Sequence, residues 1–243
     1  MEYVIVTVLA IILGQIVAHL NKKMPPVVAE EITYKEYYST LIKDFKFDFK
    51  WSLILITIFN LLMYFLEASV TSYIYMCVVA VLMIVFSIDF RFQLIPDETH
   101  IAIALLSLVN IIFTSASFVD CILGALTGGG IFLAISLLAL LIYKKEGMGF
   151  GDVKLMCALG FLFGIEKILV VTLVSFFIGA IIGIGAIVFS KKDSKSYMPF
   201  GPFIVIGSLV LMVVNPQIII DMYIGICSGL SNIINDVIWF FIK

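Results

Sequence analysis

Residues 119–152 read VDCILGALTGGGIFLAISLLALLIYKKEGMGFGD and combine the two features on which the predicted fold rests. The first part, 119–143, is an apolar run long enough to cross a bilayer as a helix, which takes about 20 apolar residues. The second part is a short charged loop, followed by three glycines that alternate with other residues before Asp152. The stretch therefore predicts a membrane-spanning helix that ends in a polar loop carrying an acidic residue.

The composition of the whole chain extends this prediction. Of the 243 residues, 63% are hydrophobic and 13% are charged. A soluble globular chain is roughly 45–50% apolar and about 25% charged. We therefore expect an all-α integral membrane protein, a bundle of about eight transmembrane helices. The expected spans are 3–20, 51–66, 70–88, 99–116, 119–143, 153–165, 168–190 and 201–215, and 217–242 is left unassigned because it carries a polar stripe.

The polar segment 21–50 follows the first span and mixes charges of both signs. It predicts a small insert after the first helix, which begins at the prolines 25–26 and could form a helix near the lipid headgroups over 30–44. The chain is thus expected to divide into 1–50, the first transmembrane helix with this insert, and 51–243, a polytopic bundle.

The positions of lysine and arginine predict the orientation in the membrane. Placing the insert in the cytoplasm puts every Lys and Arg there except Lys167 and Lys243. Cytoplasmic loops carry this positive excess, so we expect a multi-pass protein of the cytoplasmic, or inner, membrane.

Several classes of function are excluded by composition and spacing. A net charge of -2 leaves no basic surface for nucleic acid. The four cysteines lie far apart, and His19 and His100 are single and separated, so the sequence predicts neither a zinc site nor a metalloprotease.

Two aspartates, Asp89 and Asp152, lie at the ends of predicted spans. The spans 99–116 and 119–143 separate them and lead the chain out and back, so both carboxylates are expected at one face of the membrane. Two carboxylates within a few ångströms share one proton, because they cannot both ionise easily. The ionised member can then take a proton from water while the neutral member polarises a carbonyl, as in an aspartic protease.

The same residues carry a family resemblance. Gly149-Phe150-Gly151-Asp152 resembles the GxGD motif of intramembrane aspartic proteases, and the wider string GMGFGDVKL resembles type IV prepilin peptidases. The segment from Asp89 to Ile95-Pro96-Asp97 resembles the other motif of that family. Further similar features are Met198-Pro199-Phe200-Gly201-Pro202-Phe203, Leu123-Gly124 and Gly128-Gly129-Gly130, so that the likeness covers about 80 to 210.

The resemblance implies an aspartic endopeptidase that cuts the basic leader from type IV prepilin or pseudopilin precursors, at the cytoplasmic membrane face and next to an apolar helix. It implies Asp89 and Asp152 as the catalytic pair, with Gly149, Gly151 and Asp97 shaping or supporting the site. No metal is implied, and proteolysis needs no cofactor. The implied partners are the precursors and the lipid bilayer.

The amino-terminal part departs from the bifunctional members of the family, which also methylate the new amino terminus. The segment 21–50 lacks the paired cysteines that are frequent there. Methyl transfer is left open, and S-adenosylmethionine is expected only if that activity is present.

Other interpretations remain open at this point. A related preflagellin or archaellin-type leader peptidase would have similar motifs, and a proton-coupled transporter also places carboxylates in the membrane. Asp97 is as readily a helix cap as a support for Asp89. Lys154 could tune Asp152 or lie in a solvated loop, and Gly128, Gly129 and Gly130 favour close helix packing.

Overall fold

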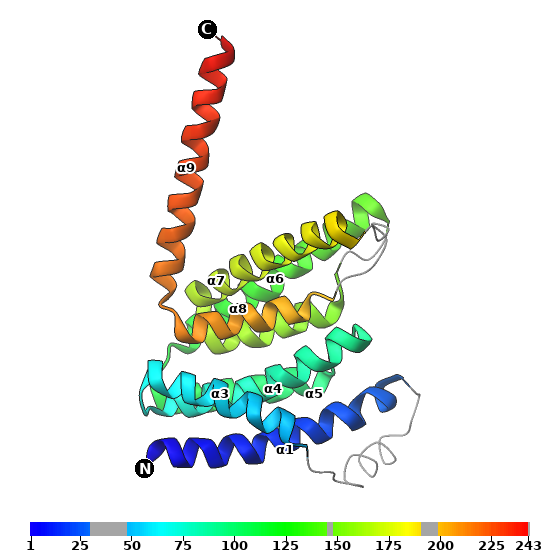
Figure 1. Ribbon diagram of the computed structural model, residues 1–243, viewed down its shortest axis with the longest axis vertical. Coiled ribbons are helices and arrows are strands. Elements are labelled where there is room, and N and C mark those ends of the chain that lie inside the picture. Colours follow the sequence, from blue (N-terminus) through cyan, green and yellow to red (C-terminus); the bar gives the residue numbers. More distant parts are fainter. Residues whose placement is uncertain (30–47, 145–147, 191–198, 243) are drawn as a thin grey trace.

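The computed structural model describes residues 1–29, 48–144, 148–190 and 199–242, and within these ranges the regular elements are all α-helices. This confirms the predicted all-α membrane fold. The helices are α1 (Glu2–Ala29), α3 (Phe49–Leu66), α4 (Val70–Phe92), α5 (Asp97–Thr114), α6 (Phe118–Tyr143), α7 (Phe150–Ser190), α8 (Gly201–Val213) and α9 (Pro216–Ile242). Figure 1 shows α1 to α8 packed side by side, while α9 extends away from them.

Among the described residues, six helices are long and apolar enough to cross a membrane, or seven if α8 and α9 form one bent span. The predicted number was about eight. The difference arises at α7, which contains both of the predicted spans 153–165 and 168–190.

Helix α7 folds back on itself at Gly164, where φ is 77° and ψ is -179°. A Cβ atom on Gly128 of α6 would lie 2.6 Å from the Met156 carbonyl oxygen and 2.8 Å from the Ile168 side chain. Residues 156 and 168 would be about 18 Å apart in a straight helix, so these two contacts require a reversal between them. Asp120 of α6 stabilises the turn, because its Oδ1 accepts a hydrogen bond from the Ile165 N–H at 3.3 Å.

The end of the first helix was predicted wrongly. Helix α1 continues through the prolines at 25 and 26 to Ala29, because its packing against the bundle does not stop at Leu20: the side chains of Asn21 and Met24 are also buried. The helix expected within 30–44 lies outside the described residues, and the division at residue 50 stays a prediction.

A polar contact joins α1 to the start of α3, on either side of the segment 30–47. The Gln15 side chain donates to the Asp48 carbonyl at 3.0 Å and to Ser52 Oγ at 2.7 Å, and it accepts from the Asp48 N–H at 2.9 Å. The Asp48 carboxylate caps α3 and pairs with Lys22 at 2.9 Å, which holds the pKa of that carboxyl below its usual value.

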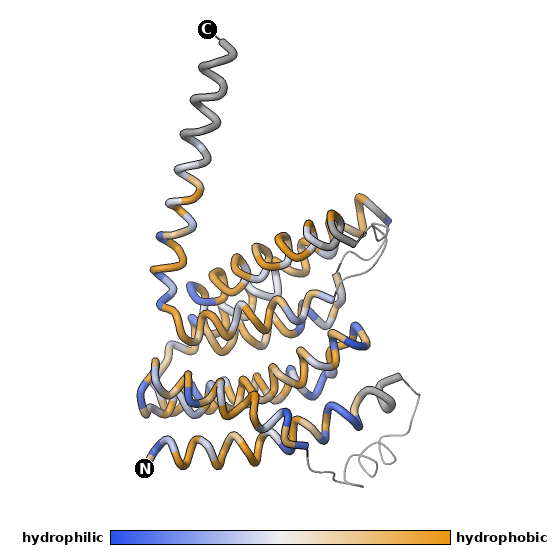
Figure 2. Tube along the Cα trace, in the orientation of Figure 1, coloured by the Kyte–Doolittle hydropathy of each residue, from blue (hydrophilic) through white to orange (hydrophobic). Residues whose placement is uncertain are grey.

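The helices, α1 and α3 included, pack into one apolar core, and hydrophilic residues gather mainly at helix ends and turns (Figure 2). The main contacts pair α6 with α7, α1 with α3, α7 with α8, and α4 with α5. Helix α8 is short, and the chain bends by 114° between it and α9, so the predicted span 201–215 ends two residues early, at Val213.

The glycines of α6 fall into two groups. Gly124 touches the backbone of Gly160 on α7, and Gly128 touches the backbone of Met156. These contacts agree with the expected packing role, because small residues let membrane helices approach closely. Gly130 differs, since a Cβ atom there would meet nothing within 4 Å.

We expect Gly164→Ala to lower the free energy of unfolding by about 1–3 kcal/mol, because this backbone conformation is nearly restricted to glycine. The new methyl group would also collide with the Asp120 carboxylate. Thermal unfolding in detergent measures the loss. Gly183→Ala is the matched control, since a Cβ atom there has open space. Equal stability of the two variants would contradict the assigned turn.

Candidate active site

Asp89 lies in the last turn of α4 and is 4% exposed. The helix ends immediately after it, because Gln93 adopts a left-handed conformation and its N–H donates to the Asp89 carbonyl at 2.9 Å. The chain then runs through Leu94 and the buried Ile95 to α5. The end of α4 thus holds a carboxylate beside the loop that starts the next helix.

Asp152 lies in the first turn of α7 and is also 4% exposed. Its N–H donates to the Gly149 carbonyl at 3.1 Å. The preceding residue, Gly151, packs on the α4–α5 loop, since a Cβ atom there would be 3.2 Å from Ile95 Cβ. This contact brings the two predicted motifs together, and the amino-terminal end of α7 favours a negative charge at this position.

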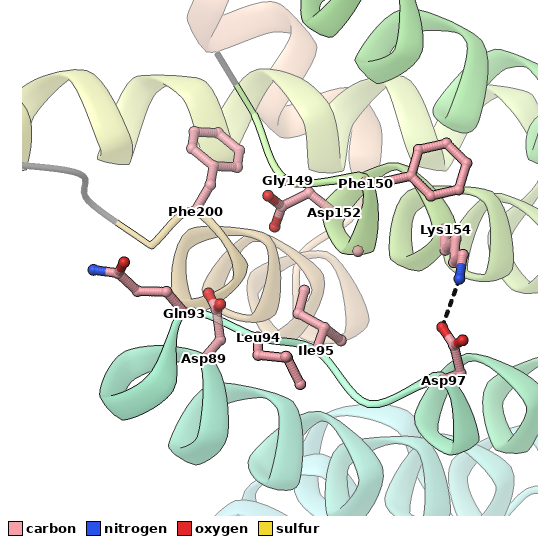
Figure 3. Close-up of a pocket in the computed structure, with 11 residues that line it drawn as sticks. Asp89, Gln93, Leu94, Ile95, Asp97, Gly149, Phe150, Asp152, Lys154 and Phe200 are labelled. Atoms are coloured by element: carbon pink, nitrogen blue, oxygen red, sulfur yellow. Dashed lines mark hydrogen bonds and ion pairs between the residues drawn. The ribbon is translucent and has the colours of Figure 1, made fainter. Parts of the chain in front are cut away.

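The two carboxylates enter one pocket of about 260 Å³ (Figure 3). They extend into the same space from α4 and α7. All five residues that the sequence predicted for the site line this pocket: Asp89, Asp97, Gly149, Gly151 and Asp152. The lining is completed by Gln93, Leu94, Ile95, Phe150, Lys154 and Phe200.

One oxygen of each carboxylate lacks a hydrogen-bond partner within the described part of the chain. These atoms are Asp89 Oδ2 and Asp152 Oδ1, and both are buried. Burying a polar group without a partner costs free energy, and such groups in native proteins call for an explanation. The two residues also line a cavity that is large enough for several water molecules or for a peptide group.

The start of α8 forms the third side of the pocket. Phe200 lines it, and Gly201 lies against Asp89, where a Cβ atom would be 2.5 Å from Oδ2. Phe200 is held by Phe132 and Phe176, whose ring centroids lie 5.7 and 5.1 Å away. No chemical role could be predicted for the segment 199–203. In the structure, this segment places Gly201, which has no side chain, against the carboxylate of Asp89.

An ion pair missed in the sequence analysis borders the pocket. Lys154 Nζ donates to Asp97 Oδ1 at 2.7 Å, which joins the first turn of α7 to the first residue of α5. Asp97 therefore pairs with another helix, and residue 96, which provides no side-chain cap, occupies the cap position of α5. No sequence signal predicts this pair, because 57 positions separate its members.

Among the described residues, no three histidine, cysteine or acidic side chains gather as a metal-binding group. His100 lies beside Asp97, with Nδ1 at 3.5 Å from Oδ1. What the geometry offers chemically is a pair of acid–base groups next to one cavity at the ends of two helices.

Comparison with known proteins shows a similarity over the segment that carries this site. The profile of the type IV leader peptidase family matches residues 76–184. Similar curated proteins carry the name prepilin leader peptidase/N-methyltransferase. That of Aeromonas hydrophila is 32% identical over 126 residues, which are 51% of this chain and 43% of the relative.

Two further proteins with the same name show similar identity. The relative from Legionella pneumophila is 34% identical over 141 residues, 57% of this chain and 48% of its own. The Escherichia coli (strain K12) relative is 30% identical over 142 residues, 57% of this chain and 60% of its own. The chain thus spans about half the length of the curated relatives it matches. No solved structure matches the chain.

The matched segment contains α5 and α6 in full, the end of α4 with Asp89, and the start of α7 with Asp152. It also contains the contact between Gly151 and Ile95 that brings these two carboxylates to one pocket. Over residues 76–184, this chain is therefore similar to the type IV leader peptidase family.

Proposed function

We propose that this protein is an aspartic endopeptidase that removes the leader peptide from type IV prepilin or pseudopilin precursors. The observation that carries the proposal is the pair of buried carboxylates, Asp89 and Asp152, which share one pocket and each keep an oxygen without a partner among the described residues. The similarity of residues 76–184 to the type IV leader peptidase family supports the same activity.

The proposed reaction uses one water molecule held between the two carboxyl groups, of which one is ionised and one protonated. The ionised group accepts a proton as the water oxygen bonds to the scissile carbonyl carbon, and the protonated group donates to the carbonyl oxygen. The carbon–nitrogen bond then breaks: the amine leaves with a proton from one carboxyl group, and a hydroxyl of the tetrahedral intermediate returns its proton to the other, which restores the pair with one proton. Proteolysis in this scheme needs no cofactor, and any methyl transfer to the new amino terminus would use S-adenosylmethionine.

The position of the pair favours a peptidase over a transporter. Asp89 lies in the last turn of α4 and Asp152 in the first turn of α7, so both lie close to helix ends. Carboxylates that couple proton flow to transport usually lie near the middle of the membrane. A pair at one rim is instead reached by a peptide bond that lies just outside the bilayer.

We expect Asp89→Asn and Asp152→Asn each to reduce leader removal by about 10²–10⁴-fold, because each removes one acid–base group from the reaction. Purified protein mixed with a candidate precursor, followed by mass measurement of the products, tests this. Asp221→Asn, which changes an exposed carboxylate on α9, is the control and should cleave normally. Normal cleavage by both site variants would defeat the proposal.

We further propose that the pocket faces the cytoplasm. Arg91, Lys144 and Lys154 lie at the helix ends nearest the site, whereas Lys167 follows the turn of α7 at Gly164. In a variant without the native cysteines, a membrane-impermeant thiol reagent should label Lys167→Cys in intact cells and spare Lys144→Cys until the membrane is opened. The reverse labelling pattern would invert the orientation.

The pair of Asp97 and Lys154 is proposed to position the two motifs. Its side chains are 66% and 41% exposed, and exposed ion pairs contribute only about 0–1 kcal/mol to stability. We therefore expect Asp97→Lys and Lys154→Asp each to lower kcat several-fold, with little change in melting temperature. The double exchange, Asp97→Lys with Lys154→Asp, should recover most of the rate. A double variant as slow as its parents would show that the ion pair has no positioning role.

A further inference from the structure

A second and larger cavity, of about 870 Å³, forms a groove between α5, α6 and the first part of α7. Its walls are mostly apolar. Large side chains such as Ile101, Leu126 and Phe161 alternate there with small ones such as Ala104 and Ala158. From Lys154 to Phe161 the groove follows about 10 Å of helix α7, which corresponds to about two turns of a helix lying in it.

The groove is continuous with the pocket that holds the two aspartates. Asp97, Phe150 and Lys154 line both cavities, and they form the boundary between a polar and an apolar compartment. The ammonium group of Lys154 lies over the Phe150 ring, with Nζ at 5.4 Å from the ring centroid. A chain that enters the pocket at the carboxylates therefore has an apolar path away from it.

The floor of the groove is open because of Gly130. A Cβ atom there would meet nothing within 4 Å, whereas Gly124 and Gly128 on the same helix touch α7 directly. Helix packing therefore does not account for glycine at position 130. Its absence of a side chain leaves room for an occupant.

A buried polar side chain in the same wall points to a bound molecule. His100 is 7% exposed and its Nδ1 lies 3.5 Å from Asp97 Oδ1, while neither ring nitrogen makes a geometrically acceptable hydrogen bond within the residues that the structure describes. It lines the groove beside Asp97 and close to the backbone of Gly151. An imidazole in this place can donate to or accept from a peptide group that passes between the groove and the pocket.

We propose that the groove binds the apolar helical segment of the precursor on the membrane side of the cleaved bond, an inference that rests on the proposed leader peptidase function. Apolar walls with small residues suit a helix in lipid, because close contact between helices drives their association there. The shared boundary at Asp97, Phe150 and Lys154 places the end of such a helix next to the carboxylates. His100 then meets backbone groups where the helix becomes extended.

Photo-crosslinking tests binding without requiring cleavage. A photoreactive residue replaces Leu126, which lines the groove, or Leu138, an exposed residue of α6 that does not, each in the full-length Asp152→Asn protein. We expect an adduct with the precursor at position 126, mapped to its apolar segment, and little at position 138. Equal adducts at both positions, no adduct at 126, or an adduct only with the leader would overturn the proposal.

A space-filling substitution tests the effect on catalysis. Gly130→Leu should raise KM for the full precursor by about tenfold, the order of effect of losing one buried apolar side chain, with little change in kcat. Gly183→Leu is the matched control, because it also adds a side chain in open space but lies outside the groove. Both variants should melt close to the parent.

The two experiments separate the groove from the reaction. An unchanged KM in a folded Gly130→Leu protein would show that the groove holds lipid chains and not the precursor. An adduct at position 126 with a precursor that the parent protein never cleaves would keep the groove as a binding surface and remove the proposed protease function.

Discussion

The burial of two carboxylates beside one cavity is the constraint that the rest of this structure must satisfy. A buried ion costs several kcal/mol even after the protein relaxes around it. Asp89 and Asp152 are nearly inaccessible, and each keeps an oxygen without a partner in the described residues. Packing around them must therefore hold an arrangement that the carboxylates themselves disfavour. Glycine supplies that packing, since Gly151 rests on Ile95 and Gly201 rests on Asp89.

In lipid, such packing cannot rely on the exclusion of water. Apolar side chains gain little by leaving acyl chains for a helix interface, so close contact between backbones carries more of the stability. Helix α6 and the folded-back α7 show this at Gly124 and Gly160, and the reversal at Gly164 lets both halves of α7 reach the same face of α6. The first half of α7 begins with Asp152, so the rigidity of this hairpin fixes the position of one carboxylate.

Much of the fold could be predicted from the sequence, because hydrophobic length is a strong signal in a membrane protein. The two aspartates could be placed on one side from the even number of crossings between them. The end of α1 could not be predicted in this way. Its charged and proline residues resemble the end of a helix, and the burial of Asn21 and Met24 is visible only in the structure. The pair of Asp97 and Lys154 and the contact of Gly201 with Asp89 join residues far apart in sequence, and no local pattern encodes such contacts.

In the proposed function, the two cavities would divide the work of a protease that acts at a membrane surface. Peptide hydrolysis needs water and acid–base groups, which belong near the ends of helices, while recognition of an apolar segment needs a surface within the lipid. Placing Asp97 and Lys154 at the boundary meets both needs, because an ion pair that is partly exposed tolerates water on one side and carries its aliphatic atoms toward the other. The same boundary limits how far an apolar helix can advance toward the carboxylates. Under the proposed function, the bond that reaches the water between Asp89 and Asp152 would therefore be set by where the apolar segment ends.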